Sequence, residues 1–166
     1  MSPLPSTINM HATCIKLEMG ALVTGVLLTG PSGSGKSSLA LQLVDQPGYG
    51  ASGDTLIHGR LVADDQVLLR VEKDQIVVEA PSRLQGLIEV AGIGIVTTTN
   101  IDEVCLGFAV EHCASSCADR MPEAKWFEHS GLKVPKYNLD FRTPVATAMI
   151  RTLALAHWGV ISLIDG

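Results

Sequence analysis

A glycine-rich segment near the amino terminus carries the strongest chemical signal in the chain. It has the spacing G-x-x-x-x-G-K-S, in which glycines let successive backbone N–H groups converge on phosphate oxygens. The lysine of such a loop reaches the terminal phosphates of a nucleoside triphosphate, and the hydroxyl that follows it is a ligand of Mg²⁺. We therefore predict that ATP and Mg²⁺ bind here, with Ser37 as a metal ligand. The residues assigned to nucleotide binding are Gly30, Pro31, Ser32, Gly33, Ser34, Gly35, Lys36, Ser37 and Ser38.

Three carboxylates after this loop are candidates for phosphoryl transfer, which needs acidic groups for the metal and for the proton of the attacking hydroxyl. Asp64 and Asp65 directly follow the apolar run Leu61-Val62-Ala63, at the end of a predicted strand. Neighbouring residues of a straight strand point to opposite faces, so either the chain turns at this pair or the two carboxylates have different roles. Glu89 stands alone among apolar residues and glycines, which fits either a functional group or the exposed residue of an edge strand.

An α/β framework is needed to bring these residues together. The segment 22–29 is apolar on both faces, as expected for a central strand, and 36–44 has a helical apolar pattern. These two elements place the glycine-rich loop between a strand and a helix, which is the context that a phosphate-binding loop requires. Further strands are predicted at 11–17, 60–69, 75–80, 84–90 and 92–98, with mostly loop at 45–59.

The carboxy-terminal half has fewer structural signals. A helix is predicted at 143–158, with Thr143 as its cap and Pro144 at the first helical position. The segment 101–111 is apolar and allows a helix, and 111–136 has no clear pattern. Residues 1–10 are expected to be a flexible lead-in. The whole chain, 1–166, is predicted to form one α/β domain.

The composition excludes several classes of protein. The net charge of −5, without a basic cluster, argues against a protein that binds nucleic acid. No segment has the length and apolar character of a membrane span, and no signal peptide is recognised. We therefore expect a cytoplasmic protein with reduced cysteines. The hydrophobic share of 46% favours a homo-oligomer.

Four segments of the chain, taken together, resemble one family of bacterial enzymes. They are His11-Ala-Thr-Cys14, the stretch from Gly25 to Ser37, Arg60-Leu-Val-Ala-Asp-Asp65 and Leu87-Ile-Glu-Val-Ala-Gly-Ile-Gly-Ile95. Over residues 11–95 they resemble the carboxy-terminal catalytic domain of HPr kinase/phosphorylase, in a short form without the family's amino-terminal domain. The resemblance implies a P-loop α/β core shared with phosphoenolpyruvate carboxykinase, assembled as a hexamer.

The same resemblance implies a reaction and roles for the matching residues. The expected activity is transfer of phosphate from ATP to a serine of the phosphocarrier protein HPr, together with the reverse reaction. In this reaction Asp64 accepts the serine proton, and Glu89 is a Mg²⁺ ligand. The residues that are assigned to catalysis are His11, Lys36, Asp64, Asp65 and Arg120.

Departures from the family pattern keep other functions open. Ala91 stands where the family usually has arginine, which leaves the phosphorylase reaction in question, and the match thins over 96–142. One alternative is a P-loop kinase of a small metabolite, although such enzymes tend to carry an arginine-rich lid and the arginines here are scattered. Another is a nucleotide-sensing module with little turnover. Turnover with HPr, ATP and Mg²⁺ separates the last alternative from the enzymes.

Overall fold

Short strands build most of the structure, a computed structural model that describes residues 7–114 and 123–164. The strands are β1 (Ile8–His11), β2 (Thr13–Met19), β3 (Leu22–Thr29), β4 (His58–Ala63), β5 (Gln66–Glu72), β6 (Gln75–Glu79), β7 (Leu87–Val90), β8 (Gly94–Thr97), β9 (Glu103–His112), β10 (Lys125–His129) and β11 (Leu132–Leu139). The helices are α1 (Lys36–Asp45) and α2 (Ala146–His157), with short 3₁₀ turns at Gly50–Ser52 and Ser82–Leu84.

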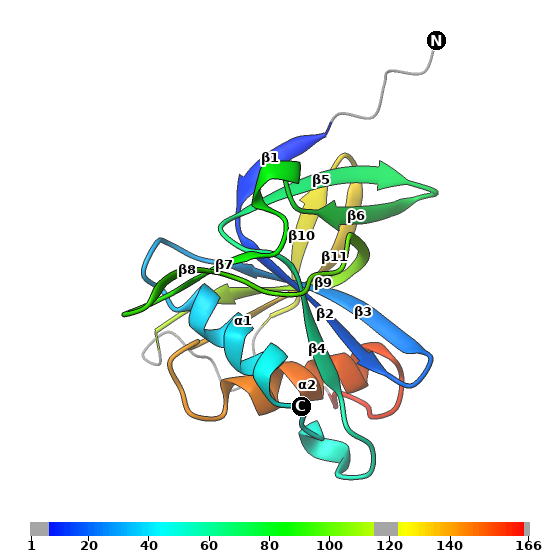
Figure 1. Ribbon diagram of the computed structural model, residues 1–166. Helices are drawn as coiled ribbons and strands as arrows, with labels where there is room; N and C mark the ends of the chain where they lie inside the picture. The colour runs from blue at the N-terminus through cyan, green and yellow to red at the C-terminus, as the bar shows by residue number, and fades with distance from the viewer. Residues whose placement is uncertain (1–6, 115–122, 165–166) are drawn as a thin grey trace.

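Most of the strands join one mixed sheet. Its order is β1-β5-β6-β9-β3-β2-β4, and β11 also pairs with β9, while β7 and β8 form a separate hairpin. β3 runs parallel to β9 and antiparallel to β2. β10 joins the same sheet by pairing with β11. In Figure 1 the two helices lie on the lower side, beside β2, β3 and β4, and the β1-β5-β6 end of the sheet and β10 lie at the top. The predicted α/β fold class is confirmed.

The central strands are buried on both faces. Their alternate side chains point to opposite sides of the sheet, and a hydrophobic cluster lies on each side. In β3, Val26 and Leu28 pack in a cluster with the two helices, and Leu27 belongs to a second cluster on the other side. The sequence prediction of a central strand at 22–29 is therefore confirmed. The helices contribute Leu39, Leu43, Ile150 and Leu155 to the first cluster. Strands β5 and β6 contribute Val67, Leu69, Ile76 and Val78 to the second.

The predicted strand at 60–69 is in fact two strands. The chain leaves β4 at Ala63, turns through Asp64 and Asp65, and returns as β5. Asp65 has a φ of 69°, in the left-handed region that Asp tolerates better than most residues. The turn, rather than a straight strand, sets the directions of the two carboxylates.

Three other predictions were wrong in part. The segment 101–111 is not helical: β9 lies between β6 and β3, and a strand buried on both faces has no alternation that distinguishes it from a helix. Residues 8–10 belong to β1, which pairs with β5, rather than to a flexible lead-in. The final helix begins at Ala146 and not at Thr143, because the chain first makes a turn in which the Ala146 N–H donates to the Thr143 carbonyl.

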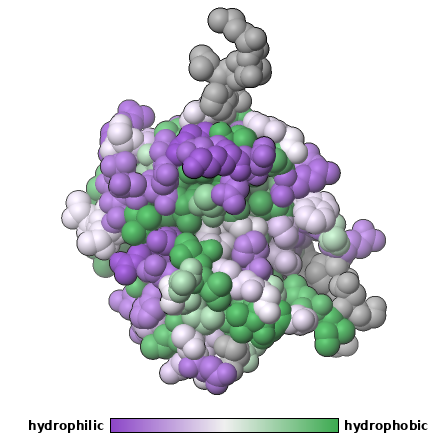
Figure 2. Space-filling model, turned by 90° about the vertical axis from the view of Figure 1, so that its right-hand side faces the viewer, coloured by the Kyte–Doolittle hydropathy of each residue, from purple (hydrophilic) through white to green (hydrophobic). Residues whose placement is uncertain are grey.

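Charged side chains gather around β5 and β6. Arg70 of β5 forms ion pairs with Glu72, Glu79 and Glu103. Figure 2 shows hydrophilic residues over the upper part of one side of the molecule and hydrophobic patches lower down. Among the helices of the described residues, none has the length and apolar character needed to cross a membrane.

Candidate active site

The glycine-rich segment forms a loop between β3 and α1, as predicted. Gly33 and Gly35 have φ values of 81° and 100°, which glycine adopts without steric cost. Lys36 is the first residue of α1, and its side chain turns back into the loop. Its Nζ donates to the carbonyl oxygens of Gly30 at 2.6 Å and Pro31 at 2.9 Å. The loop thus curls around the lysine.

Burial changes the chemistry of Lys36. Only 6% of the residue is exposed. This burial lowers the pKa of the ammonium group because water no longer solvates the charge, and the charges of Asp64 and Asp65 oppose the shift. A cation that is poorly solvated gains more from a phosphate than an exposed lysine does.

The start of α1 has the features of a phosphate site. Its first turn contains no acidic residue, and no side chain among the residues that the structure describes caps it. The N–H groups of that turn therefore have no carboxylate competing for them, and the helix dipole adds partial positive charge at the loop. These features fit the triphosphate of a nucleotide.

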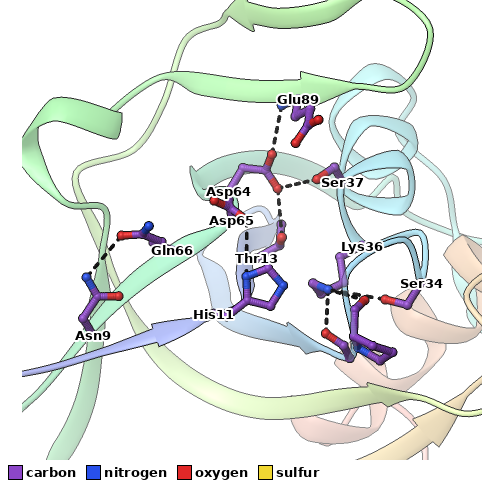
Figure 3. Close-up of polar contacts among 12 residues, drawn as sticks. Asn9, His11, Thr13, Ser34, Lys36, Ser37, Asp64, Asp65, Gln66 and Glu89 are labelled. Atoms are coloured by element: carbon purple, nitrogen blue, oxygen red, sulfur yellow. Dashed lines mark hydrogen bonds and ion pairs between the residues drawn. The ribbon is translucent and has the colours of Figure 1, made fainter.

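Asp64 joins the loop to the end of β4. Its side chain is buried, and Oδ1 accepts hydrogen bonds from Ser37 Oγ at 2.7 Å and Thr13 Oγ1 at 2.9 Å. Oδ2 accepts the backbone N–H of Glu89 at 2.9 Å. Figure 3 shows Asp64 between the loop and β7. One carboxylate therefore connects three segments that the sequence separates widely.

Asp65 points away from Asp64 and pairs with His11. Asp65 Oδ1 lies 3.2 Å from His11 Nδ1, and the side chains are 57% and 46% exposed. The turn at this point places one carboxylate inside the site and its neighbour at the surface. Of the two alternatives that the sequence left open, the structure therefore shows the first: the chain turns at this pair.

Glu89 is a candidate oxygen ligand for a hard cation. It is exposed on β7, and its carboxylate lies on the side of Asp64 and Ser37 in Figure 3. Within residues 7–114 and 123–164, no three His, Cys, Asp or Glu side chains are grouped to hold a metal alone. Mg²⁺ suits such a site, since it is usually bound by one or two carboxylates together with water and substrate phosphates.

Of the remaining described residues assigned to the site from the sequence, Ser34 alone lies beside Lys36. Ser34 is buried, with Oγ 3.4 Å from Lys36 Nζ, whereas Ser32 and Ser38 are exposed. Arg120 lies outside the residues that the structure describes.

Two residues of the site were missed by the sequence reasoning. Thr13 is fully buried and donates to Asp64, and Arg142 donates from Nη2 to the carbonyl of Gly33 at 2.7 Å. Thr13 lies within the His11-Ala-Thr-Cys segment and was available from that motif. Arg142 has no local signal, because its contact spans 109 positions of the chain.

Comparisons with known proteins identify the family of this chain. A sequence profile described as the HPr Serine kinase C-terminal domain matches residues 3–103. HPr kinase/phosphorylase from Peptoclostridium acidaminophilum is 46% identical over 78 residues, which is 46% of this chain and 22% of that protein. The chain thus matches about a fifth of the length of this relative.

A solved structure extends the comparison to most of the fold. The Hpr(Ser) kinase/phosphatase from Coxiella burnetii superimposes with a TM-score of 0.72 at 24% sequence identity, covering 92% of this chain and 97% of that one. At this identity the likeness shows the shared fold. The family itself follows from the profile, which covers more than half of the chain. The chain belongs to the family of the HPr serine kinase C-terminal domain.

Proposed function

We propose that this protein is an ATP- and Mg²⁺-dependent protein-serine kinase whose substrate is HPr. The observation that supports this most directly is the 2.7 Å hydrogen bond between Ser37 and Asp64, which joins the phosphate loop to the acidic pair. A kinase needs a carboxylate close to the phosphate loop, where it can orient the attacking hydroxyl and take its proton. HPr enters the proposal from the name of the relative and from the family.

The phosphate end of ATP is assigned to the loop and Lys36. Lys36 Nζ donates to two loop carbonyls, and the third N–H of its ammonium group can turn toward a phosphate oxygen. Ser37, with Glu89 beside it, is assigned to the metal. Bound Mg²⁺ would neutralise charge on the β- and γ-phosphate oxygens.

The proton of the attacking serine is assigned to Asp64. This carboxylate already accepts hydrogen bonds from two hydroxyl groups, those of Thr13 and Ser37, so a third hydroxyl is a chemically matched donor. Its contact with Ser37 puts it next to the position assigned to the γ-phosphate. The Asp65–His11 pair stands beside it at the surface, where it can orient the incoming segment.

The exposure of the site favours a protein substrate over a small metabolite. Asp65, His11 and Glu89 are all exposed, so a serine on a folded partner can approach them without entering a deep cavity. A metabolite kinase must surround its substrate to exclude water. The exposed residues form the rim of the substrate side, and Asp64 lies buried behind them.

Transfer of radiolabelled phosphate tests the proposal. Purified protein is incubated with γ-labelled ATP, Mg²⁺ and HPr, or with HPr in which the regulatory serine is replaced by alanine. We expect label on HPr only when the serine is present. ATP binding without transfer to HPr would support the nucleotide-sensing alternative. Label on a small molecule, when metabolites are supplied in place of HPr, would support the small-molecule kinase. Addition of inorganic phosphate to phosphorylated HPr tests the reverse reaction.

A further inference from the structure

The segment that leads into α2 packs against the outside of the phosphate loop. Arg142 Nη2 donates to the Gly33 carbonyl, and a Cβ atom placed on Gly35 would lie 3.8 Å from Phe141 Cβ and 4.0 Å from Arg142 Cγ. Phe141 is buried, and its N–H donates to His112 Nδ1 at 3.2 Å, at the end of β9. The loop is thus supported from the carboxy-terminal end of the chain.

The contact fixes one peptide unit of the loop at both ends. The Ser34 N–H donates to the Pro31 carbonyl at 3.1 Å, while the Gly33 carbonyl of the same peptide accepts from Arg142. Gly33 has no side chain to restrict it and a φ of 81°, so this peptide has little else to define its orientation. Loss of Arg142 would release the carbonyl and allow the peptide to rotate.

Arg142 also brings a positive charge to the site. The Arg142 N–H donates to Asp140 Oδ1 at 2.9 Å, which fixes the backbone from which the side chain extends. A guanidinium has five N–H donors in a planar fork that suits phosphate oxygens, and the side chain is exposed rather than buried under other groups. Lys36 binds the loop carbonyls of Gly30 and Pro31, so the two cations hold different parts of one loop.

We propose that Arg142 is a positioning residue of the nucleotide site, which holds the Gly33–Ser34 peptide for phosphate binding and adds its charge to the polyphosphate subsite. This inference rests on the proposed binding of ATP but not on HPr as the substrate. It assigns a role to a residue from the part of the chain in which the sequence showed no functional motif.

Binding of a nucleotide series tests this role without turnover. Affinities for AMP, ADP and ATP are measured by calorimetry, with Mg²⁺ and without HPr, for the wild type and for Arg142→Ala and Arg142→Lys. In Arg142→Ala we expect the affinity for ATP to fall about tenfold, on the scale of one charge-assisted hydrogen bond, with a smaller loss for ADP and the smallest for AMP. Arg142→Lys keeps the charge and should recover part of the loss. The salt dependence of ATP binding should also weaken in Arg142→Ala.

Arg60→Ala is the matched control. Arg60 is also an exposed arginine, but it pairs with Glu18 on β2, so its removal takes away the same charge elsewhere. Its affinities should equal those of the wild type. Wild-type affinities in Arg142→Ala would overturn the inference. Equal losses for AMP, ADP and ATP would also overturn it, because they indicate general damage to the fold. A wild type that binds no ATP would instead overturn the proposed function, and the inference with it.

Discussion

Replacement of Asp64 by asparagine separates the chemistry of this carboxylate from its structural contacts. An asparagine can turn its carbonyl oxygen toward the Glu89 N–H, which leaves its NH₂ group facing Thr13 and Ser37. Both hydroxyls can accept as well as donate, so every polar group keeps a partner. The side chain retains its shape but can no longer accept a proton.

The structure gives the size of the expected effects. Three hydrogen bonds lose the extra strength of a charged acceptor, about 1 kcal/mol each, and the relief of a buried charge offsets part of that loss. We therefore expect the free energy of unfolding to fall by no more than about 2 kcal/mol. Loss of the general base should lower the rate of phosphate transfer by about 10²-fold or more.

Two further variants complete the test. Asp64→Leu would leave the buried Thr13 hydroxyl and the Glu89 N–H without an acceptor, so it should cost about 2–5 kcal/mol. Asp65→Asn, at the exposed neighbour, should reduce transfer less than Asp64→Asn does. Stability is measured by urea unfolding and transfer by initial rates with labelled ATP. Near-normal transfer by Asp64→Asn, together with a large loss in Asp65→Asn, would show that the roles of the two carboxylates are reversed.

Three other predictions concern the loop, the packing and the assembly. Burial lowers the pKa of Lys36, and the ammonium form is the one that binds phosphate. ATP affinity should therefore fall with rising pH at a lower pH than an ordinary lysine titrates. Lys36→Met should bind ATP weakly and lack this pH dependence, as calorimetry at several pH values would show. Gly59→Ala should destabilise the fold by about 1–3 kcal/mol in urea unfolding, because the new Cβ would clash with the Leu43 carbonyl. Gly53→Ala should cost only about 1 kcal/mol, for the left-handed φ of this residue, because none of the described atoms lies near the new Cβ. Light scattering at micromolar concentration should show a homo-oligomer, which we expect to be a hexamer, and a monomer with full activity would contradict this.

The part of the fold that the sequence predicted best is the part with strong local signals. The strand at 22–29, the loop after it and the start of α1 at Lys36 all agree with the structure, since an apolar run, a set of glycines and a helical pattern follow one another directly. The two strands predicted at 84–90 and 92–98 are present as β7 and β8, with narrower bounds, and the structure pairs them as a hairpin.

The errors share a physical cause: where the local sequence pattern fitted more than one secondary structure, tertiary contacts determined which one formed. The apolar residues of β9 fit a buried strand as well as a helix, and only the neighbouring strands select between them. The turn at Asp64 and Asp65 is fixed by contacts with Thr13, Ser37 and His11. The contact of Arg142 with the loop joins residues that lie 109 positions apart, so no local sequence pattern predicts it.

The most direct test of the central claim is the site of phosphate transfer, determined by mass spectrometry of HPr after incubation with the protein, ATP and Mg²⁺. A kinase with the proposed chemistry should place one phosphate on the regulatory serine of HPr, and Lys36→Ala should place none. The Lys36→Ala sample controls for a contaminating kinase, because this variant lacks the cation assigned to the phosphates. Unmodified HPr in the presence of a wild-type protein that binds ATP would contradict the assignment of HPr as the substrate. Equal phosphorylation by the wild type and by Lys36→Ala would contradict the assignment of the loop as the site of transfer.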